Sequence, residues 1–321
     1  MKVGIDAMGG DYAPLEAVKG ACLAKSAFPV VELVLFGRKE DILSIAGAEG
    51  IDASVFTIID TPEVIEMAEH PVKALVAKPQ SSLSVGFQYL ATHKIDAFLS
   101  AGNTGAMLVG SLQFLKTVEG LDRPCLYTGI PRIDSNPGLL LDVGANADCK
   151  PEHLSKFAIL GSLLSSMMYK NNNPKVGLLN IGEESEKGNL LTKATHQLLA
   201  QNNSINFVGN VEGRDIFGDH ADVIVCDGFT GNVVIKVCEG FYYRLAKRGV
   251  QDEYLDKFNF KHYGGSLVLG VNAPVIVGHG ITKAETFVKM VELAVQAVDS
   301  QLTLSIQQAM KKFVENQSSV S

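Results

Sequence analysis

The sequence predicts an α/β protein, built as a three-layer α/β/α sandwich with a mostly parallel sheet. Two observations lead to this prediction. Short apolar runs, typical of buried strands, alternate with longer stretches in which apolar residues recur at helical spacing. Strands that alternate with helices in this way form parallel sheets whose two faces are covered by helices.

Strands are predicted at the apolar runs that glycine or polar residues bound, which are 3–7, 32–36, 55–59, 97–100, 139–143, 176–180, 206–208, 223–226 and 274–277. Helices are predicted at 14–25, 151–168, 192–201, 232–247 and 283–313. The first two begin with proline, which suits the first turn of a helix because its missing N–H would have no partner there. We expect a single α/β catalytic domain over residues 1–321. A small helical excursion is expected at about 240–265, because the strand–helix alternation breaks between Gly249 and Gly265.

Five of the predicted strands end in a small polar loop that a helix follows. The loops cover residues 8–11, 100–105, 142–146, 180–189 and 227–232. Glycine lets backbone N–H groups crowd around a ligand, and the start of a helix adds N–H groups without a partner. Such an arrangement holds phosphate and other anions. Because ligands of open α/β sheets bind beyond the carboxyl ends of the strands, we expect these loops to cluster.

Composition narrows the class of protein. Of the 321 residues, 46% are hydrophobic and 20% are charged, which indicates a substantial folded core. The formal net charge of −7 argues against a nucleic-acid-binding protein. The five cysteines are scattered without a CxxC pair, as is typical of the reducing cytoplasm. We expect a cytoplasmic protein for two reasons. The sequence begins with a predicted strand and not with the pattern of a signal peptide, and no apolar run approaches the ~18 residues that are needed to cross a bilayer.

Several familiar motifs are missing. The segment 182–188 superficially resembles a phosphate-binding P-loop, but it ends in Lys-Gly where that motif has Gly-Lys-Ser/Thr. No GxGxxG follows a strand, and neither GxSxG nor HExxH is present. These absences weaken nucleotide hydrolysis, dinucleotide chemistry, serine hydrolysis and zinc catalysis. We expect no cofactor and no bound metal.

The loops after the first and fourth predicted strands offer candidate ligands for an anion. Asp6 ends a buried strand, where a carboxylate needs hydrogen-bond partners or a chemical role, and Gly9 and Gly10 follow it. Asp11 is interpreted as a helix cap. The second loop supplies neutral donors from Asn103, Thr104 and Gly105. Capping alone would explain them, but the related triplet Thr230, Gly231 and Asn232 follows another strand and favours a shared role in holding phosphate or an oxyanion.

The remaining loops carry the charged candidates. Asp142 and Asn146 belong to a carboxylate-rich loop, for which Mg²⁺ binding is the weaker of two interpretations because the spacing matches no known metal motif. Lys187 is the cation of the polar loops, and it either contacts phosphate or is a solvated lysine among glutamates. For Cys149 and Cys226, packing is favoured over a nucleophilic role, because no histidine is positioned to activate either thiol.

The ordered set of motifs resembles the PlsX-type phosphate acyltransferases of bacteria, which make acyl phosphate from acyl-[acyl-carrier protein] and inorganic phosphate. The resemblance runs nearly from end to end. It lies in residues 6–11, 13–14, 100–106, 122–124, 140–146, 150–154, 176–180, 187–189, 209–212, 227–233, 263–265 and 273–275. Each short motif is a weak signal, whereas their order along one chain is highly specific.

The resemblance implies a fold related to isocitrate and isopropylmalate dehydrogenases, a homodimer and a role in phospholipid synthesis. It implies catalytic roles for Lys187 and Asn232, with no cofactor. The implied phosphate- and substrate-binding residues are Asp6, Gly9, Gly10, Asn103, Thr104, Gly105, Asp142, Asn146, Asn189, Asp227, Thr230 and Gly231. A short-chain phosphate acyltransferase that uses coenzyme A thioesters and a non-catalytic phosphate- or carrier-protein-binding module are the alternatives.

The implied partners are acyl carrier protein, inorganic phosphate and a second copy of the chain. Peripheral attachment to the inner face of the membrane and a downstream glycerol-3-phosphate acyltransferase are further expectations. Two segments depart from the family pattern. Residues 76–82 lack the usual run of basic side chains, and the segment between Asn232 and Tyr263 is shorter than usual. In the family, the basic run could contact phosphate or the acidic carrier protein. The longer segment forms a helical hairpin that is used for dimer contacts, the acyl groove and attachment to the membrane surface.

Overall fold

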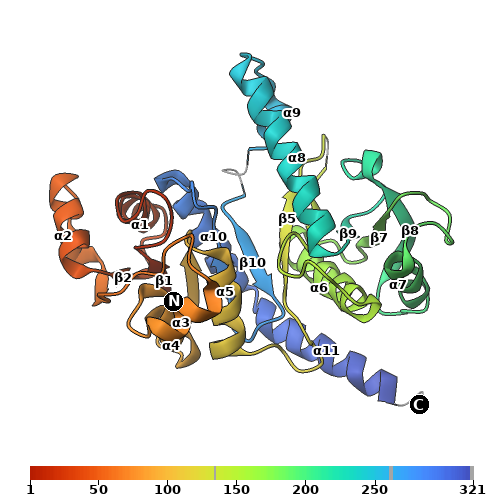
Figure 1. The fold of residues 1–321 in the computed structure, drawn as a ribbon, viewed down its shortest axis with the longest axis horizontal. Helices are drawn as coiled ribbons and strands as arrows, with labels where there is room; N and C mark the ends of the chain where they lie inside the picture. The colour runs from red at the N-terminus through yellow and green to blue at the C-terminus, as the bar shows by residue number, and fades with distance from the viewer. Residues whose placement is uncertain (134, 260–262, 319–321) are drawn as a thin grey trace. The chain divides into compact units, whose positions relative to one another are not determined.

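A computed structural model describes residues 1–133, 135–259 and 263–318 (Figure 1). The chain forms two compact units. Unit 1 comprises Met1–Lys116 and Lys261–Thr303, and unit 2 comprises Thr117–Phe260 and Leu304–Ser321. The expectation of a single catalytic domain stays a prediction, and the two units are described in turn.

Unit 1 has a sheet in the order β3-β2-β1-β4-β11-β10. Its strands are β1 (Lys2–Asp6), β2 (Glu32–Gly37), β3 (Thr57–Asp60), β4 (Ala97–Ser100), β10 (Ser266–Leu269) and β11 (Val275–Val277). All neighbours run parallel except β10 and β11, which are antiparallel. The carboxyl ends of β1, β4 and β11 therefore lie at the same edge of the sheet.

The helices of unit 1 are α1 (Leu15–Ala27), α2 (Lys39–Ala48), α3 (Pro71–Ala77), α4 (Ser82–Ala91), α5 (Thr104–Gly110) and α10 (Ala284–Asp299). Helices α1 and α10 pack together against the sheet, so closely that a Cβ on Gly20 would clash with Phe287. Helix α4 packs on β1, β2 and β4, with Gly86 against the ring of Phe98. Short turns lie at Ala53–Val55 (3-10) and Ser111–Leu115 (π).

Unit 2 has a sheet in the order β5-β6-β9-β7-β8. Its strands are β5 (Cys125–Ile130), β6 (Gly138–Leu141), β7 (Lys175–Asn180), β8 (Asn206–Glu212) and β9 (Val223–Val225). Strands β5 and β6 are antiparallel, and the other pairs are parallel. The helices are α6 (Pro151–Tyr169), α7 (Leu190–Ala200), α8 (Gly228–Lys247), α9 (Glu253–Asp256) and, from Leu304 onward, α11 (Leu302–Ser318), with a 3-10 turn at Gly213–Asp215.

The predicted fold class is confirmed, because parallel strands alternate with helices in both units. Two details of the prediction are wrong. The helix expected over 283–313 is two helices, because Gln301 has a φ of 53° and the chain cannot continue as a helix through it. Asp11 does not cap α1: the N-cap position belongs to Pro14, which has no side-chain hydrogen bond.

The expected excursion consists of the last part of α8 and the short helix α9, while Phe260 and His262 lie outside the described residues. No helix of the described residues is long and apolar enough to cross a bilayer.

Candidate functional site

The loop after β1 is fastened to the end of β4 through Asp6. This side chain is 1% exposed, its Oδ1 accepts the Met8 N–H at 3.0 Å, and its Oδ2 accepts the Ser100 hydroxyl at 2.6 Å. Ser100 in turn accepts the Gly102 N–H at 2.9 Å. Burial raises the pKa of Asp6, against the hydrogen bonds that favour its charged form. Through these hydrogen bonds, the buried Asp6 connects two candidate loops, 8–11 and 100–105.

The glycines of this loop permit a close approach of backbone to backbone. A Cβ on Gly9 would clash with Asp6 and Ser100, and Gly10 has a φ of 103°, where glycine is favoured. Next to Gly10, the Asp11 N–H donates to the Gly280 carbonyl at 2.8 Å. The structure thus adds a loop, residues 278–283 after β11, that the sequence analysis did not single out. The sequence Gly-His-Gly, which directly follows a predicted strand, could have revealed this loop.

Asn103 caps α5, and both polar atoms of its side chain form hydrogen bonds within unit 1. Its Oδ1 accepts the Ala106 N–H at 3.0 Å, and its Nδ2 donates to the carbonyl oxygens of Glu66, Met67 and Glu69, the last at 2.9 Å. Thr104 is exposed, and Gly105 packs on Pro71. Asn103 therefore shapes this loop, while the Thr104 side chain is exposed beside it.

In unit 2, Asp142 organises the loop that follows β6. Its Oδ1 accepts the N–H groups of Leu126, Gly144 and Ala145, and its Oδ2 accepts the Asn146 N–H and Nδ2 at 2.7 and 2.8 Å. The side chain is fully buried, and burial raises its pKa. Five donated hydrogen bonds leave it little capacity for a ligand, so Asp142 positions the loop backbone.

Helix α8 begins directly against this loop. Asp227 caps the helix by accepting the Thr230 N–H and hydroxyl, both at 2.8 Å. The exposed Asn232 donates through Nδ2 to the Val143 carbonyl at 3.3 Å, and it lies beside Gly144. Two sequence-distant candidate loops, 142–146 and 227–232, are therefore adjacent, with the Asn232 amide at their exposed junction.

Lys187 lies in the loop after β7, which is the parallel neighbour of β9 in the sheet. Its carbonyl accepts the Asn180 Nδ2 at 3.1 Å, and Gly188, with a φ of 99°, has no room for a side chain beside Asn180. Asn189 caps α7 through the Thr192 N–H at 2.9 Å. The loop is thus anchored at both sides of Lys187. The lysine is exposed, and its ammonium makes no hydrogen bond or ion pair in the part of the chain that the structure describes.

The cysteines near this region are poor nucleophiles. Burial raises the pKa of the Cys226 thiol well above its usual value, and the thiol donates to the Asp142 carbonyl. Burial and the Asp142 charge raise the pKa of Cys149 to about 12. Both therefore stay protonated at neutral pH, and a protonated thiol is not the reactive form.

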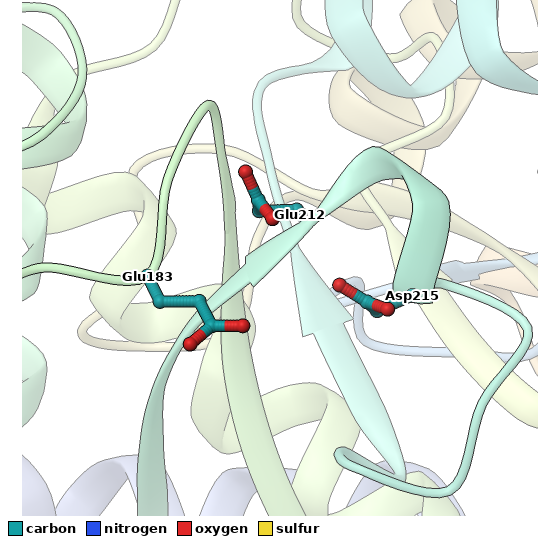
Figure 2. Close-up of side chains that lie close together, drawn as sticks. All are labelled: Glu183, Glu212 and Asp215. Atoms are coloured by element: carbon teal, nitrogen blue, oxygen red, sulfur yellow. The ribbon is translucent and has the colours of Figure 1, made fainter.

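One cluster of carboxylates could attract a cation. Glu183, Glu212 and Asp215 bring their oxygens within 4.8 Å of one another (Figure 2). Arg214 already supplies a positive charge there, because its guanidinium pairs with Glu212 and lies 3.6 Å from Asp215. We assign no metal to this cluster.

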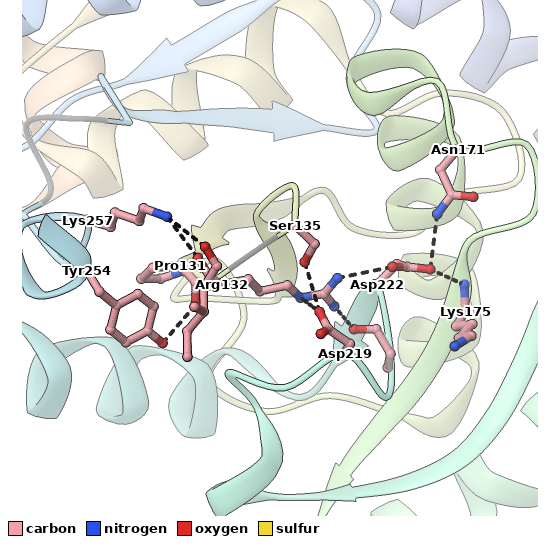
Figure 3. Close-up of polar contacts among 11 residues, drawn as sticks. Pro131, Arg132, Ser135, Asn171, Lys175, Asp219, Asp222, Tyr254 and Lys257 are labelled. Carbon is pink, nitrogen blue, oxygen red and sulfur yellow. Dashed lines mark hydrogen bonds and ion pairs between the residues drawn. The ribbon is translucent and has the colours of Figure 1, made fainter.

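A second polar cluster lies at the amino ends of β7 and β9, away from the candidate loops. The buried Arg132 pairs with Asp222 at 3.2 Å and donates to the Ala221 carbonyl (Figure 3). Tyr254 and Lys257, at α9, donate to the carbonyls of Pro131 and Arg132 at 3.3 and 3.0 Å. This cluster fastens the excursion after α8 to the β5–β6 connection, and its role is structural.

Comparison with known proteins identifies the family. The family model described as "Fatty acid synthesis protein" matches residues 1–249. A phosphate acyltransferase of Dictyoglomus thermophilum is 38% identical over 98% of this chain and 99% of its own length. The phosphate acyltransferase of Desulfitobacterium hafniense is 40% identical, over 99% of this chain and all of its own. This chain belongs to the PlsX-type phosphate acyltransferase family.

Family membership makes the chain an acyltransferase and confirms the resemblance seen in its motifs. Solved structures agree on the fold. A phosphotransacetylase from Streptococcus pyogenes superimposes with a TM-score of 0.67 at 18% identity, covering 94% of both chains. The EutD phosphotransacetylase from Staphylococcus aureus gives a TM-score of 0.64 at 17% identity, covering 93% of this chain and 94% of its own. The roles of the individual site residues, and the expectation that all five loops belong to one site, stay predictions.

Proposed function

We propose that this phosphate acyltransferase takes its acyl group from fatty acyl-[acyl-carrier protein] and delivers it to inorganic phosphate, as an early step of phospholipid synthesis. End-to-end similarity to phosphate acyltransferases, within a family described by fatty acid synthesis, is the observation that carries the proposal. The chemistry of unit 2 supports it. An exposed ammonium at Lys187 and an exposed amide at Asn232 follow neighbouring parallel strands, and the two nearby thiols are held protonated.

Phosphate itself is the nucleophile in the proposed reaction, so the enzyme needs none of its own. Backbone N–H groups of the glycine-rich loops hold the phosphate, and Lys187 balances its charge. A phosphate oxygen attacks the thioester carbonyl carbon. The new C–O bond forms, the C–S bond breaks, and the carrier thiolate leaves and takes a proton from solvent. Alignment of two bound reactants contributes much of the acceleration, since effective molarities reach ~10⁵ M or more.

Asn232 is the proposed donor to the oxyanion that forms at the carbonyl. Its present hydrogen bond to Val143 is long, at 3.3 Å, so exchanging that acceptor for a substrate oxygen costs little. Asn232 is the fifth residue of α8, directly after the first turn, whose amino end carries the positive end of the helix dipole. A backbone N–H of the first turn of α8 is the second donor in this proposal.

The proposal includes a homodimer, which is supported by exposed apolar side chains on α8. Val233, Val237 and Phe241 are 46%, 65% and 64% exposed and recur at a spacing of four, which places them on one face of the helix. An exposed apolar stripe of this kind marks an interaction surface. Light scattering of the purified protein should give twice the chain mass, and Phe241→Asp should shift it toward the monomer. A wild-type monomer would remove this part of the proposal.

The carrier protein is proposed to dock on the basic end of α8. Arg244, Lys247 and Arg248 are all exposed there, in a chain whose net charge is −7. Charge reversal at Lys247 and Arg248 should lower affinity for the carrier protein and reduce its dependence on salt. Unchanged affinity and salt dependence would place docking elsewhere. Peripheral membrane attachment and a downstream glycerol-3-phosphate acyltransferase stay expectations from the family.

The deciding experiment supplies phosphate with one of two acyl donors of the same chain length. Acyl-[acyl-carrier protein] and acyl-coenzyme A are incubated separately with the protein, and hydroxylamine traps the acyl phosphate as hydroxamate. We expect faster product formation from the carrier-protein thioester, with none when phosphate is omitted. Preference for the coenzyme A thioester would favour the alternative, a phosphate acyltransferase that uses coenzyme A thioesters. Saturable binding without thioester loss would indicate a non-catalytic module.

A further inference from the structure

Unit 2 contains a cavity of about 1230 Å³. None of the candidate site residues described above lies on its wall. The walls come from the start of α6, the residues before β5, the turn after α7 and Phe313 of α11. All of these segments belong to unit 2. The volume is ample for a complete small molecule, since ligand pockets are typically ~300–1,000 Å³.

Two polar groups of residues on the cavity wall have no hydrogen-bond partner in the described part of the chain, and one of them is a buried atom. Ser155 is 6% exposed, and its hydroxyl has no hydrogen bond within the described part of the chain. The Asn202 Nδ2 is likewise buried without an acceptor among the described residues. A buried polar group without a partner costs free energy, so native proteins rarely leave one without a reason. The Asn202 amide is one such group at this wall, and the Ser155 hydroxyl of the same wall is a donor that no described residue uses.

His153 adds a donor of fixed orientation. The side chain is 6% exposed, and its Nδ1 accepts the Lys150 N–H at 3.1 Å. Because Nδ1 is the acceptor, the neutral ring carries its proton on Nε2. No residue that the structure describes accepts from Nε2. Burial and the Arg123 charge lower the pKa of His153, so the ring is neutral at neutral pH and offers the Nε2 hydrogen to the cavity.

The charges around the cavity favour an anion. Lys156 is paired with Asp122 at 2.7 Å, which neutralises both. Arg123 and Lys150 remain as exposed cations, although Glu152 opposes them on the same wall. The start of α6, a helix of 19 residues, adds the positive end of its dipole. Donors and positive charge thus predominate, whereas Leu198 and Phe313 supply apolar surface.

We propose that this cavity is a second ligand site, which binds a small molecule with a phosphate group and an apolar body. Arg123, Lys150 and the Nε2–H of His153 contact the phosphate, with the Ser155 hydroxyl as a further donor. Leu198 and Phe313 pack against the apolar body. The site is separate from the acyl-transfer chemistry, and the inference does not depend on the identity of the acyl donor.

The test uses octyl phosphate as the probe in calorimetric titrations. Because this compound resembles an acyl phosphate, the titrations use the full chain with Lys187→Ala, which weakens binding at the candidate loops. We expect octyl phosphate to bind this variant, with inorganic phosphate at least about tenfold weaker. Adding Arg123→Gln or Ser155→Ala should weaken octyl phosphate at least about tenfold, the usual effect of losing a hydrogen bond to a charged group.

The matched control is Lys193→Gln, which removes an exposed cation from α7 outside the cavity wall and should leave the affinity unchanged. Circular dichroism of each variant checks that it is folded. The proposal is overturned if the Lys187→Ala chain does not bind octyl phosphate. It is equally overturned if Arg123→Gln and Ser155→Ala both bind it as the control does. Equal affinity for inorganic phosphate would overturn the assignment of an apolar body.

Discussion

The α-carbon of Gly231 lies so close to the main-chain carbonyl of Asp142 that a Cβ on Gly231 would overlap the Asp142 oxygen. Gly228, one turn earlier, meets the Asn146 carbonyl in the same way, and its N–H donates to that oxygen at 2.8 Å. The first turn of α8 is therefore seated on the 142–146 loop by backbone contact. This contact fixes where Asn232, the next residue of the helix, presents its amide.

Replacing Gly231 with alanine should destabilise the protein. The added methyl group has to displace either α8 or the 142–146 loop, and overpacking of this kind typically costs ~1–3 kcal/mol. The matched control is Gly240→Ala in the same helix, where a Cβ meets nothing within 4 Å. The control should stabilise the protein by roughly 0.5–1 kcal/mol, because alanine is the better helix former. Urea denaturation measures the change in the free energy of unfolding for both variants. An equal effect of the two substitutions would contradict the close backbone contact between Gly231 and Asp142.

Lys187→Ala should weaken the use of phosphate. The proposed role of the ammonium is to balance phosphate charge, so its loss should raise the KM for phosphate and lower kcat/KM by roughly 10²-fold. Lys193→Ala, an exposed lysine of α7, is the control and should retain normal kinetics. Initial rates at varied phosphate provide the measurement. If the folded Lys187→Ala protein has wild-type kcat/KM, Lys187 has no part in the mechanism.

Asn232→Ala should lower kcat with little effect on the KM for phosphate. An oxyanion donor acts mainly in the transition state, and loss of one such donor typically costs roughly 10²–10³ in turnover. The side chain is exposed and makes one long hydrogen bond, so stability should change little. Gln88→Ala, which removes an exposed amide from α4, is the control and should leave turnover normal. A fall in phosphate affinity at unchanged kcat would instead make Asn232 a phosphate ligand.

Parallel strands were predictable from the sequence because each one is a short apolar run that leads into a polar loop and a helix. The run 97–100 coincides with β4, and the polar residues after it begin α5. Strands β5 and β10 lack this signature: both pair antiparallel with a strand close in sequence, so no crossover helix follows them. The pattern that reveals a strand–helix unit therefore misses a hairpin.

Helix α4 escaped prediction for a different reason. Buried side chains cover most of its surface, including Leu83, Phe87 and Leu90, and Gly86 fits against Phe98. Such a helix has too narrow a polar face for helical periodicity to stand out. Long amphipathic helices such as α6 and α8 keep that face and are predictable to within a few residues at most ends.

The loops of the candidate site were predictable from the sequence, but which of their side chains support the loop and which stay exposed was not. Polar residues at strand ends mark a ligand-binding edge, and the sequence shows them. Which side chains turn inward depends on tertiary partners. Asn103 reaches carbonyl oxygens more than 30 residues away, and Asp142 reaches the Leu126 N–H. These contacts make Asn103 and Asp142 supports of their loops, whereas Thr104, Lys187 and Asn232 stay exposed.

The buried imidazole of His153 should make stability depend on pH. Its pKa in the folded chain is lowered by burial and by the charges of Arg123, Lys156 and Lys150, against Asp122, which raises it. Above the ordinary value of about 6.5 both states are neutral, and His153 contributes no pH dependence. As the pH falls below about 6.5, the unfolded chain binds a proton that the folded chain resists, so the free energy of unfolding decreases.

His153→Gln should remove this component, because glutamine retains an acceptor for the Lys150 N–H and does not titrate. We expect the urea midpoint of the wild type to fall more steeply than that of the variant between about pH 7.5 and about pH 5.5. His220→Gln, at an exposed position, should follow the wild type. If the urea midpoints of the wild type and His153→Gln depend on pH in the same way, His153 binds a proton equally well in the folded and unfolded states. That result would contradict the burial of His153 on the wall of the cavity.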